Sequence, residues 1–207
     1  MKMIITSLLL ALALSASANE AELLELLKNK EASAEQKQAA IAAGNQRAFL
    51  CKYCHGDDGN SKKSTIPNLA SQNTVYLIRQ FELFANGQRQ NKTMNELAKL
   101  LSAEEKVNIA LFYSQLKVKP QSVYNPELLQ QGKRLYETRC FFCHGQDAHG
   151  HDKLPRIATQ PVDYIVRTLS SYQSALVKRA ETQMSEIART LKADEIEALA
   201  SYLSSMP

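Results

Sequence analysis

The chain has 207 residues and carries 25 Lys and Arg against 21 Asp and Glu, a formal net charge of +4 at pH 7. This excess is modest, and no basic patch is interleaved with aromatic residues, so composition argues against a nucleic-acid-binding protein. The four cysteines all fall in two short motifs, which leaves none for a different chemistry.

The first eighteen residues predict a secretory signal peptide. Lys2 supplies a positive start, residues 4–14 form an almost unbroken apolar run, and Ala16-Ser17-Ala18 matches an A-x-A cleavage site. The apolar run is far shorter than the roughly 20 residues that a bilayer-crossing helix needs. We therefore expect an exported, soluble periplasmic protein that begins near Asn19 and has no integral membrane segment after cleavage.

Residues 19–43 predict an additional N-terminal amphipathic helix. Leu23, Leu24, Leu26 and Leu27 lie close to many charged residues in this segment. We expect the helix either to pack across a domain or to recruit a partner.

Two C-x-x-C-H motifs follow, Cys51-Lys52-Tyr53-Cys54-His55 and Cys140-Phe141-Phe142-Cys143-His144. In this pattern each cysteine sulfur forms a thioether with a vinyl group of a porphyrin, and the histidine is the proximal iron ligand. A redox dithiol does not need histidine directly after its second cysteine. A zinc ribbon would need its two cysteine pairs about 15–20 residues apart, much closer than they are here. The sequence therefore predicts two covalently bound haem c groups.

The chain repeats itself at offsets of 88 to 90 residues after each motif. Ile66-Pro67-Asn68-Leu69-Ala70 corresponds to Leu154-Pro155-Arg156-Ile157-Ala158, and Tyr76-Leu77-Ile78-Arg79 corresponds to Tyr164-Ile165-Val166-Arg167. We predict one domain at residues 44–118 and a second at residues 126–207. Each is small for a lone hydrophobic core, and a buried porphyrin can supply the missing apolar mass.

Helical periodicity dominates both repeats, and no segment alternates for long enough to require a sheet. The fold class is therefore all-α. The predicted helices include residues 34–50, 74–85 and 161–174, the last with Pro161 in its first turn. The segment at residues 119–125 is polar and contains Pro120, so we interpret it as a linker.

Capping residues and glycines add detail to these helices. Ser102 and Glu105 form a capping box that opens another helix, and its counterpart in the second repeat begins near Ala193. Gly44 and Gly132 precede the two haem motifs, and each indicates the close approach of another backbone.

Met94 and Met184 are candidate distal ligands of the two irons. Outside the signal and the penultimate position they are the only methionines, and they follow His55 and His144 by 39 and 40 residues. A thioether on the distal face completes six-coordination and favours ferrous iron. Electron transfer is then expected, because no coordination position stays open for a substrate.

These motifs, together with Asn86-Gly87-Gln88-Arg89 before Met94, resemble the cytochrome c4 family of class I di-haem cytochromes c over nearly all residues after Ala43. The resemblance implies two tandem class I cytochrome c domains, each a small helical bundle around one covalent haem. It implies His55 with Met94 and His144 with Met184 as axial pairs. It also implies that the carbonyls of Pro67 and Pro155 accept from Nδ1 of the proximal histidines, and that the haem propionates contact Tyr76, Arg79, Tyr164 and Arg167.

The predicted function is electron transfer, not catalysis. We expect a shuttle that carries single electrons between a membrane quinol-oxidising complex and a terminal oxidase or periplasmic reductase. Two alternatives stay open. One is an electron-accepting subunit of a periplasmic oxidoreductase such as thiosulfate dehydrogenase, with the N-terminal helix as a docking element. The other is a di-haem peroxidase, which needs one five-coordinate iron and is disfavoured by the two methionines.

Overall fold

The computed structural model describes residues 20–121, 124–174 and 183–207. Within these ranges the chain is helical and forms no β-strand; an isolated bridge joins His151 and Leu154. The predicted all-α class is thereby confirmed. The predicted signal peptide at residues 1–18 lies outside the described residues. No helix among those described combines the length and the apolar composition needed to cross a membrane.

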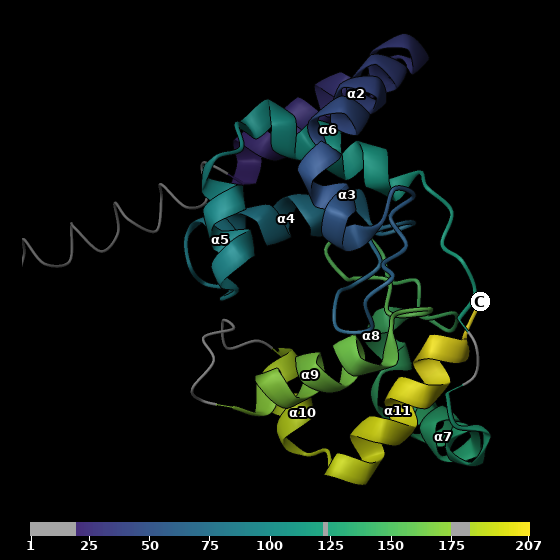
Figure 1. The fold of residues 1–207 in the computed structure, drawn as a ribbon. Helices are drawn as coiled ribbons and strands as arrows, with labels where there is room; N and C mark the ends of the chain where they lie inside the picture. Colours follow the sequence, from purple (N-terminus) through teal and green to yellow (C-terminus); the bar gives the residue numbers. More distant parts are fainter. Residues whose placement is uncertain (1–19, 122–123, 175–182) are drawn as a thin grey trace, which may run out of the picture.

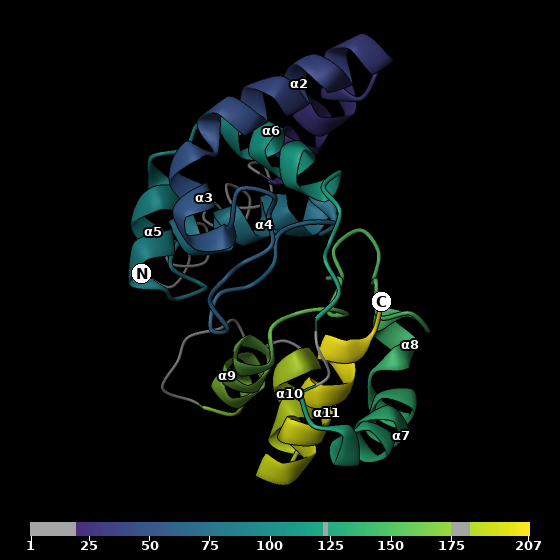
Figure 2. The same ribbon diagram turned by 45° about the vertical axis from the view of Figure 1, so that its right-hand side comes forward.

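The helices form two bundles, one from each half of the chain (Figures 1 and 2). Their buried apolar side chains make two separate clusters, so each half has its own core. The first bundle contains a helix over residues 20–30, α2 (Ala34–Arg47), α3 (Phe49–His55), α4 (Thr74–Ala85), α5 (Lys92–Lys99) and α6 (Ala103–Ser114). The second contains the 3₁₀ turn η1 (Pro126–Leu128), α7 (Leu129–Arg139), α8 (Phe141–His144), α9 (Val162–Gln173), α10 (Gln183–Arg189) and α11 (Ala193–Ser205).

The same helix crossing occurs in both bundles. The helix before the haem motif packs on the helix that ends the repeat, α2 on α6 and α7 on α11. A Cβ added to Gly44 would lie 2.5 Å from the carbonyl carbon of Asn108, and one added to Gly132 would lie 2.6 Å from Cβ of Tyr202. Only glycine permits these approaches, so the close contacts predicted from the two glycines are confirmed.

Two helix boundaries in the first half differ from those predicted. Residues 19–43 do not form one helix, because the helix over residues 20–30 ends and Ser33 caps α2 by accepting from the backbone N–H of Gln36. As a result, α2 runs across the predicted boundary between residues 43 and 44. The helix predicted over residues 34–50 is also interrupted, since Ala48 lies between α2 and α3.

Helix starts elsewhere follow the predicted signals closely. The capping box of Ser102 and Glu105 opens α6, and α11 begins at Ala193. Pro161 is the residue before α9 and not part of its first turn, because its ψ of 138° is extended. A residue in that conformation ends the preceding loop and lets the helix begin at Val162.

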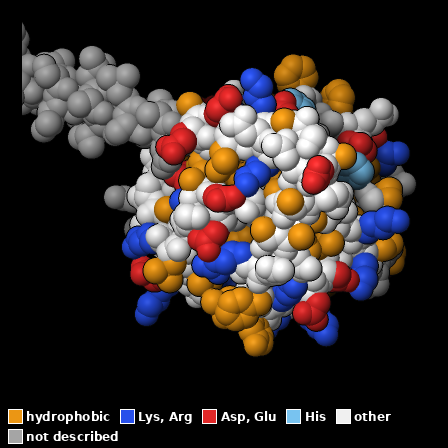
Figure 3. Space-filling view, turned by 90° about the horizontal axis from the view of Figure 1, so that it is seen from above, with side chains coloured by type: hydrophobic (Ala, Val, Ile, Leu, Met, Phe, Trp, Pro, Cys, Tyr) orange, Lys and Arg blue, Asp and Glu red, His pale blue; other side chains and the backbone are white. Residues whose placement is uncertain are grey.

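The N-terminal helix belongs to the first bundle. Leu23 and Leu27 are buried in that core, and Lys30 forms an ion pair with Glu104 at the start of α6. Glu20 pairs with Lys153 of the second bundle at 2.8 Å. The expected amphipathic face therefore packs against its own chain. Figure 3 shows that acidic and basic side chains are interspersed on this side of the molecule, without a patch of one sign.

Candidate haem sites

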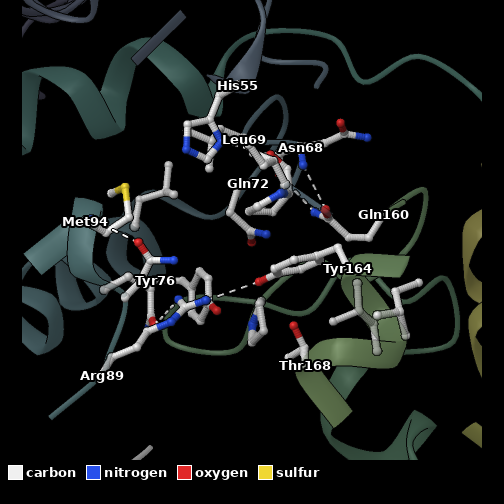
Figure 4. Close-up of a pocket in the computed structure, with 18 of the residues that line it drawn as sticks. His55, Asn68, Leu69, Gln72, Tyr76, Arg89, Met94, Gln160, Tyr164 and Thr168 are labelled. Carbon is white, nitrogen blue, oxygen red and sulfur yellow. Dashed lines mark hydrogen bonds between the residues drawn. The ribbon is translucent and has the colours of Figure 1, made fainter. Parts of the chain in front are cut away.

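A cavity of about 550 Å³ lies between the two bundles and is lined by both. The first bundle contributes His55, Pro67 and Met94, and the second contributes His144, Pro155 and Met184. The predicted ligands, which are scattered over 130 positions of the sequence, thus face one interior space. Figure 4 shows His55 and Met94 of the first bundle in this cavity, together with Tyr164 and Thr168 of the second.

Each proximal histidine is placed by the last turn of a short helix. His55 ends α3 and His144 ends α8, and the glycine that follows each one has a positive φ, 83° at Gly56 and 82° at Gly145. Both imidazole rings are buried. Such a turn is readily formed by glycine and lets the chain leave the helix immediately after the ligand.

Proline carbonyls orient both rings. Nδ1 of His55 lies 2.9 Å from the carbonyl oxygen of Pro67, and Nδ1 of His144 lies 3.1 Å from that of Pro155. Because a carbonyl can only accept, Nδ1 must carry the proton and Nε2 is left with a free lone pair. These are the hydrogen bonds that the family resemblance implies, and they leave the second ring nitrogen available for a metal.

Burial also keeps these rings neutral. It lowers the pKa of both His55 and His144 below the ordinary value for histidine, although the proline carbonyls act in the opposite direction. For His55, the positive charge of Arg89 lowers the pKa further. A neutral imidazole is the form that ligates a metal.

Met94 and Met184 lie on two short helices that sequence analysis did not predict. Met94 is in the first turn of α5, where its backbone N–H donates to Oδ1 of the N-cap Asn91 at 3.0 Å. Met184 is the second residue of α10. Both side chains are half-buried and line the cavity. The structure therefore places one thioether side chain from each repeat on the wall of the cavity that both histidines also line.

The four cysteines are free and half-buried. Burial raises the pKa of Cys51 above its ordinary value and that of Cys140 to about 11. A redox-active dithiol needs a lowered thiol pKa, so this environment does not favour that chemistry. Within the described ranges, no group of three or more His, Cys, Asp or Glu side chains is arranged so that it could hold a metal ion.

The residues expected near the propionates are only partly brought together. Tyr76, Tyr164 and Arg167 line the cavity, whereas Arg79 is exposed and is not among the lining residues. Arg89 lines it instead. Its guanidinium donates to Gln80 at 2.6 Å and to the hydroxyl of Tyr164 at 3.2 Å, which joins the two bundles. Figure 4 shows this contact.

Arg89 has no predicted role, although it ends the segment Asn86-Gly87-Gln88-Arg89 that contributes to the family resemblance. Gln72 and Gln160 were also missed. Both are buried and line the cavity. The sequence feature that could have identified Gln72 and Gln160 is that the two repeats carry glutamine at the same position, 88 residues apart.

The residues present fit one covalent haem c in each half. Each half offers two free thiols, a buried neutral imidazole with Nε2 available and a thioether on the wall of a common cavity. Tyr113 also lines the cavity, and its buried hydroxyl has no hydrogen-bond partner in the described structure. A polar group of a bound cofactor would satisfy it.

Comparison with known proteins points to one family. Residues 127–203 match the family of cbb3-type cytochrome c oxidase subunit III. Cytochrome c4 of Thiocapsa roseopersicina is 32% identical over 177 residues, which cover 79% of this chain and 91% of that protein. The crystal structure of reduced recombinant cytochrome c4 from Pseudomonas stutzeri superposes with a TM-score of 0.74 at 26% identity and covers 81% of this chain and 98% of that one.

A further relative bears a more specific name. The thiosulfate dehydrogenase electron acceptor of Thiomonas intermedia is 32% identical over 147 residues, which cover 65% of this chain and 68% of that protein. Taken with the two tandem bundles and the two C-x-x-C-H motifs, these similarities establish that the chain belongs to the cytochrome c4 family, as a di-haem class I c-type cytochrome that holds two covalent haem c groups and transfers electrons without being an enzyme.

Proposed function

We propose that this cytochrome is a periplasmic shuttle that carries single electrons from a membrane quinol-oxidising complex to a terminal oxidase or periplasmic reductase. In this proposal His55 with Met94 and His144 with Met184 are the axial pairs. The observation that carries it is that all four side chains line one cavity while both histidines are tied to proline carbonyls.

Each bound haem supplies a one-electron ferrous/ferric couple. The residues of the chain hold that couple in place. Pro67 and Pro155 fix the orientation of the imidazoles, and the sulfurs of Met94 and Met184 would supply the remaining ligand of each iron, which would leave no position for a substrate. The apolar walls of the cavity limit the access of water and so keep the environment of the couple nearly unchanged during electron transfer.

The proposed compartment rests on the predicted signal peptide. A free C-x-x-C in an oxidising compartment is prone to disulfide formation, whereas thioether-bound cysteines are protected. Met1 to Ala18 carry the export pattern, although they lie outside the described residues. The proposal predicts that the mature protein begins near Asn19, which mass spectrometry of the purified protein will check.

The proposed partner contacts lie beside the haem motifs. Tyr53 and Phe142 occupy the same place in the two motifs, directly before the second cysteine, and are 80% and 90% exposed. Phe49, Leu50 and Phe141 are also exposed in these segments. Exposed apolar side chains gathered at the sites of cofactor attachment suit short-lived docking of a redox partner.

A second candidate role is that of electron acceptor for thiosulfate dehydrogenase. The relative from Thiomonas intermedia that bears this name supports it. Copurification from the native source separates the two roles. A stable complex with a catalytic chain would favour the acceptor role, and recovery of the cytochrome alone would favour the shuttle.

The axial assignment is tested by replacing each methionine with leucine, which keeps the volume and removes the sulfur. We expect Met94→Leu and Met184→Leu each to lose about half of the near-infrared sulfur-to-iron band and to lower the reduction potential of one haem. Met206→Leu is the matched control, because Met206 is buried in the second core and does not line the cavity.

Two results would contradict the proposal. If neither cavity variant altered the band, the methionines would not be ligands. If the wild-type protein bound carbon monoxide at both irons or turned over peroxide, its irons would have an open position and the protein would not be a simple carrier.

A further inference from the structure

The peptide group that holds each proximal histidine is also bonded from the opposite bundle. In the first bundle, the carbonyl of Pro67 accepts from His55, and the N–H of the same peptide group belongs to Asn68. That N–H donates to Oε1 of Gln160 at 2.9 Å, and Nε2 of Gln160 donates to the carbonyl of Asn68 at 3.0 Å. Figure 4 shows this pair of bonds.

The second bundle repeats the arrangement with the roles exchanged. The carbonyl of Pro155 accepts from His144, and the N–H of Arg156 in that peptide group donates to Oε1 of Gln72 at 2.8 Å. Nε2 of Gln72 donates to the carbonyl of Arg156 at 2.9 Å. Each glutamine therefore clasps the peptide backbone of the opposite half. We call these four hydrogen bonds the glutamine clasp.

The clasp is enclosed within the protein. Gln72 is 5% exposed and Gln160 is 3% exposed. Neighbouring side chains reinforce it, since Nδ2 of Asn68 donates to the carbonyl of Thr159 at 2.8 Å and Nε of Arg156 donates to that of Ser71 at 3.2 Å.

Two strained residues sit at equivalent places beside the clasp. Ser71 and Thr159 have φ values of 55° and 58°, in the left-handed region that residues other than glycine seldom adopt. The carbonyl of Ser71 accepts from Nε of Arg156, and that of Thr159 accepts from Nδ2 of Asn68, each in the opposite half. Strain of this kind persists where the surrounding contacts fix the backbone, and both halves hold the same conformation beside the clasp.

We propose that Gln72 and Gln160 are positioning residues that act in trans, each tuning the proximal histidine, and hence the reduction potential, of the haem in the opposite half. This inference rests on the proposed roles of His55 and His144 as ligands. An amide whose N–H is engaged in a hydrogen bond has a more polarised carbonyl, which is a stronger acceptor. A stronger acceptor at Nδ1 makes the imidazole a more basic ligand, and a more basic ligand favours ferric iron.

The direction of the effect follows from this chain of bonds. Loss of the Gln160 oxygen weakens the acceptor at His55 and raises the potential of the first haem. Loss of the Gln72 oxygen does the same for His144 and the second haem. The effect crosses from one half to the other, whereas a general loosening of the interface would change both haems together.

The test uses holoprotein with Gln160→Met or Gln72→Met, which keep the length of the side chain and remove its amide. NMR of the assigned Nδ1–H protons reports each histidine separately, and potentiometric titration reports the haems. We expect Gln160→Met to shift the His55 resonance and raise one potential while the His144 resonance stays in place. Gln72→Met should give the mirror pattern.

Asn73→Ala is the matched control. The side chain of Asn73 donates to the carbonyls of His149 and Leu154 across the same interface, at 3.0 and 2.6 Å, but it contacts neither clasped peptide group. We expect both Nδ1–H resonances to remain unshifted in this variant. Gln160→Asn and Gln72→Asn, which shorten the side chain but keep its amide, provide a second pair if a methionine variant fails to retain haem.

Absence of the crossed pattern would overturn the inference, whether the shifts fell in the same half, in both halves equally or in neither. The near-infrared sulfur-to-iron band separates this failure from failure of the proposed function. If the wild type lacks the band or histidine ligation, the proposed function is wrong. If the band is intact in every variant but no crossed shift occurs, only the role of the clasp is wrong.

Discussion

Substitution of Gly44 by alanine tests the helix crossing that builds the first bundle. Helix propensity alone predicts that alanine stabilises α2 by about 1 kcal/mol. The structure predicts the opposite. The added Cβ would lie 2.5 Å from the carbonyl carbon of Asn108 and closer still to its oxygen. Since carbon atoms in contact sit about 3.5 Å apart, α2 and α6 would have to separate by roughly 1 Å.

The cost of that separation outweighs the gain in propensity. Overpacking costs about 1–3 kcal/mol, and the upper end applies because the obstacle is backbone, not the tip of a flexible side chain. The net expectation is a destabilisation of about 2 kcal/mol, or a loss of about 10 °C in the melting temperature of a domain of this size.

Thermal unfolding of the holoprotein followed by circular dichroism measures this change. Ala43→Gly is the matched control, because Ala43 is exposed on the same helix and its replacement should cost about 1 kcal/mol through propensity alone. A Gly44→Ala variant that melts at or above the wild-type temperature would refute the reasoning. It would mean that α2 and α6 can separate without losing their packing.

Two further perturbations probe charges in the first bundle. Lys106→Met should lower the free energy of unfolding, measured in urea, by about 3 kcal/mol. Lys106 and Glu82 form a mostly buried ion pair at 2.6 Å, and the carboxylate would lose this cation. An unchanged urea midpoint would show that the pair adds nothing to stability. The pKa of Glu105 lies below its ordinary value, chiefly because its carboxylate accepts from the backbone N–H of Ser102 and, second, because it accepts from Arg47. The ionised Glu105 therefore stabilises the folded protein fully at any pH above its ordinary pKa. This stabilisation is lost as the pH falls through the lower pKa of the folded state. Arg47→Met should therefore move acid unfolding to higher pH.

Long helices and local motifs could be predicted because their signals lie within a few consecutive residues. The predicted helix over residues 74–85 has the bounds of α4, and Ser102 with Glu105 marked the start of α6. The helices α5 and α10 were missed since 8 and 7 residues contain too few turns for a periodic pattern. The start of α2 at Ala34 agrees with the helix predicted over residues 34–50, whereas the break at Ala48 was missed because neither glycine nor proline marks it.

The composition of the cavity could be predicted only in part, for a geometric reason. The haem motifs fix four cysteines and two histidines by sequence alone, but which arginine faces the cavity depends on helix rotation and loop path. Arg79 points to solvent from α4, while Arg89 reaches the cavity from the loop after that helix. The clasp of Gln72 and Gln160 joins residues 88 positions apart, and no local pattern specifies such a contact.

The reciprocity of the clasp makes the contact between the bundles resemble an isologous interface, the kind that joins two identical subunits about a two-fold axis. In a true homodimer every substitution at such a surface is made twice. Covalent fusion removes that constraint and lets the halves diverge one residue at a time. Asn68 and Arg156 fill the same position with an amide in one half and a guanidinium in the other, yet both reach backbone carbonyls across the boundary. A single chain can thus combine the symmetry of a dimer interface with two unequal redox centres.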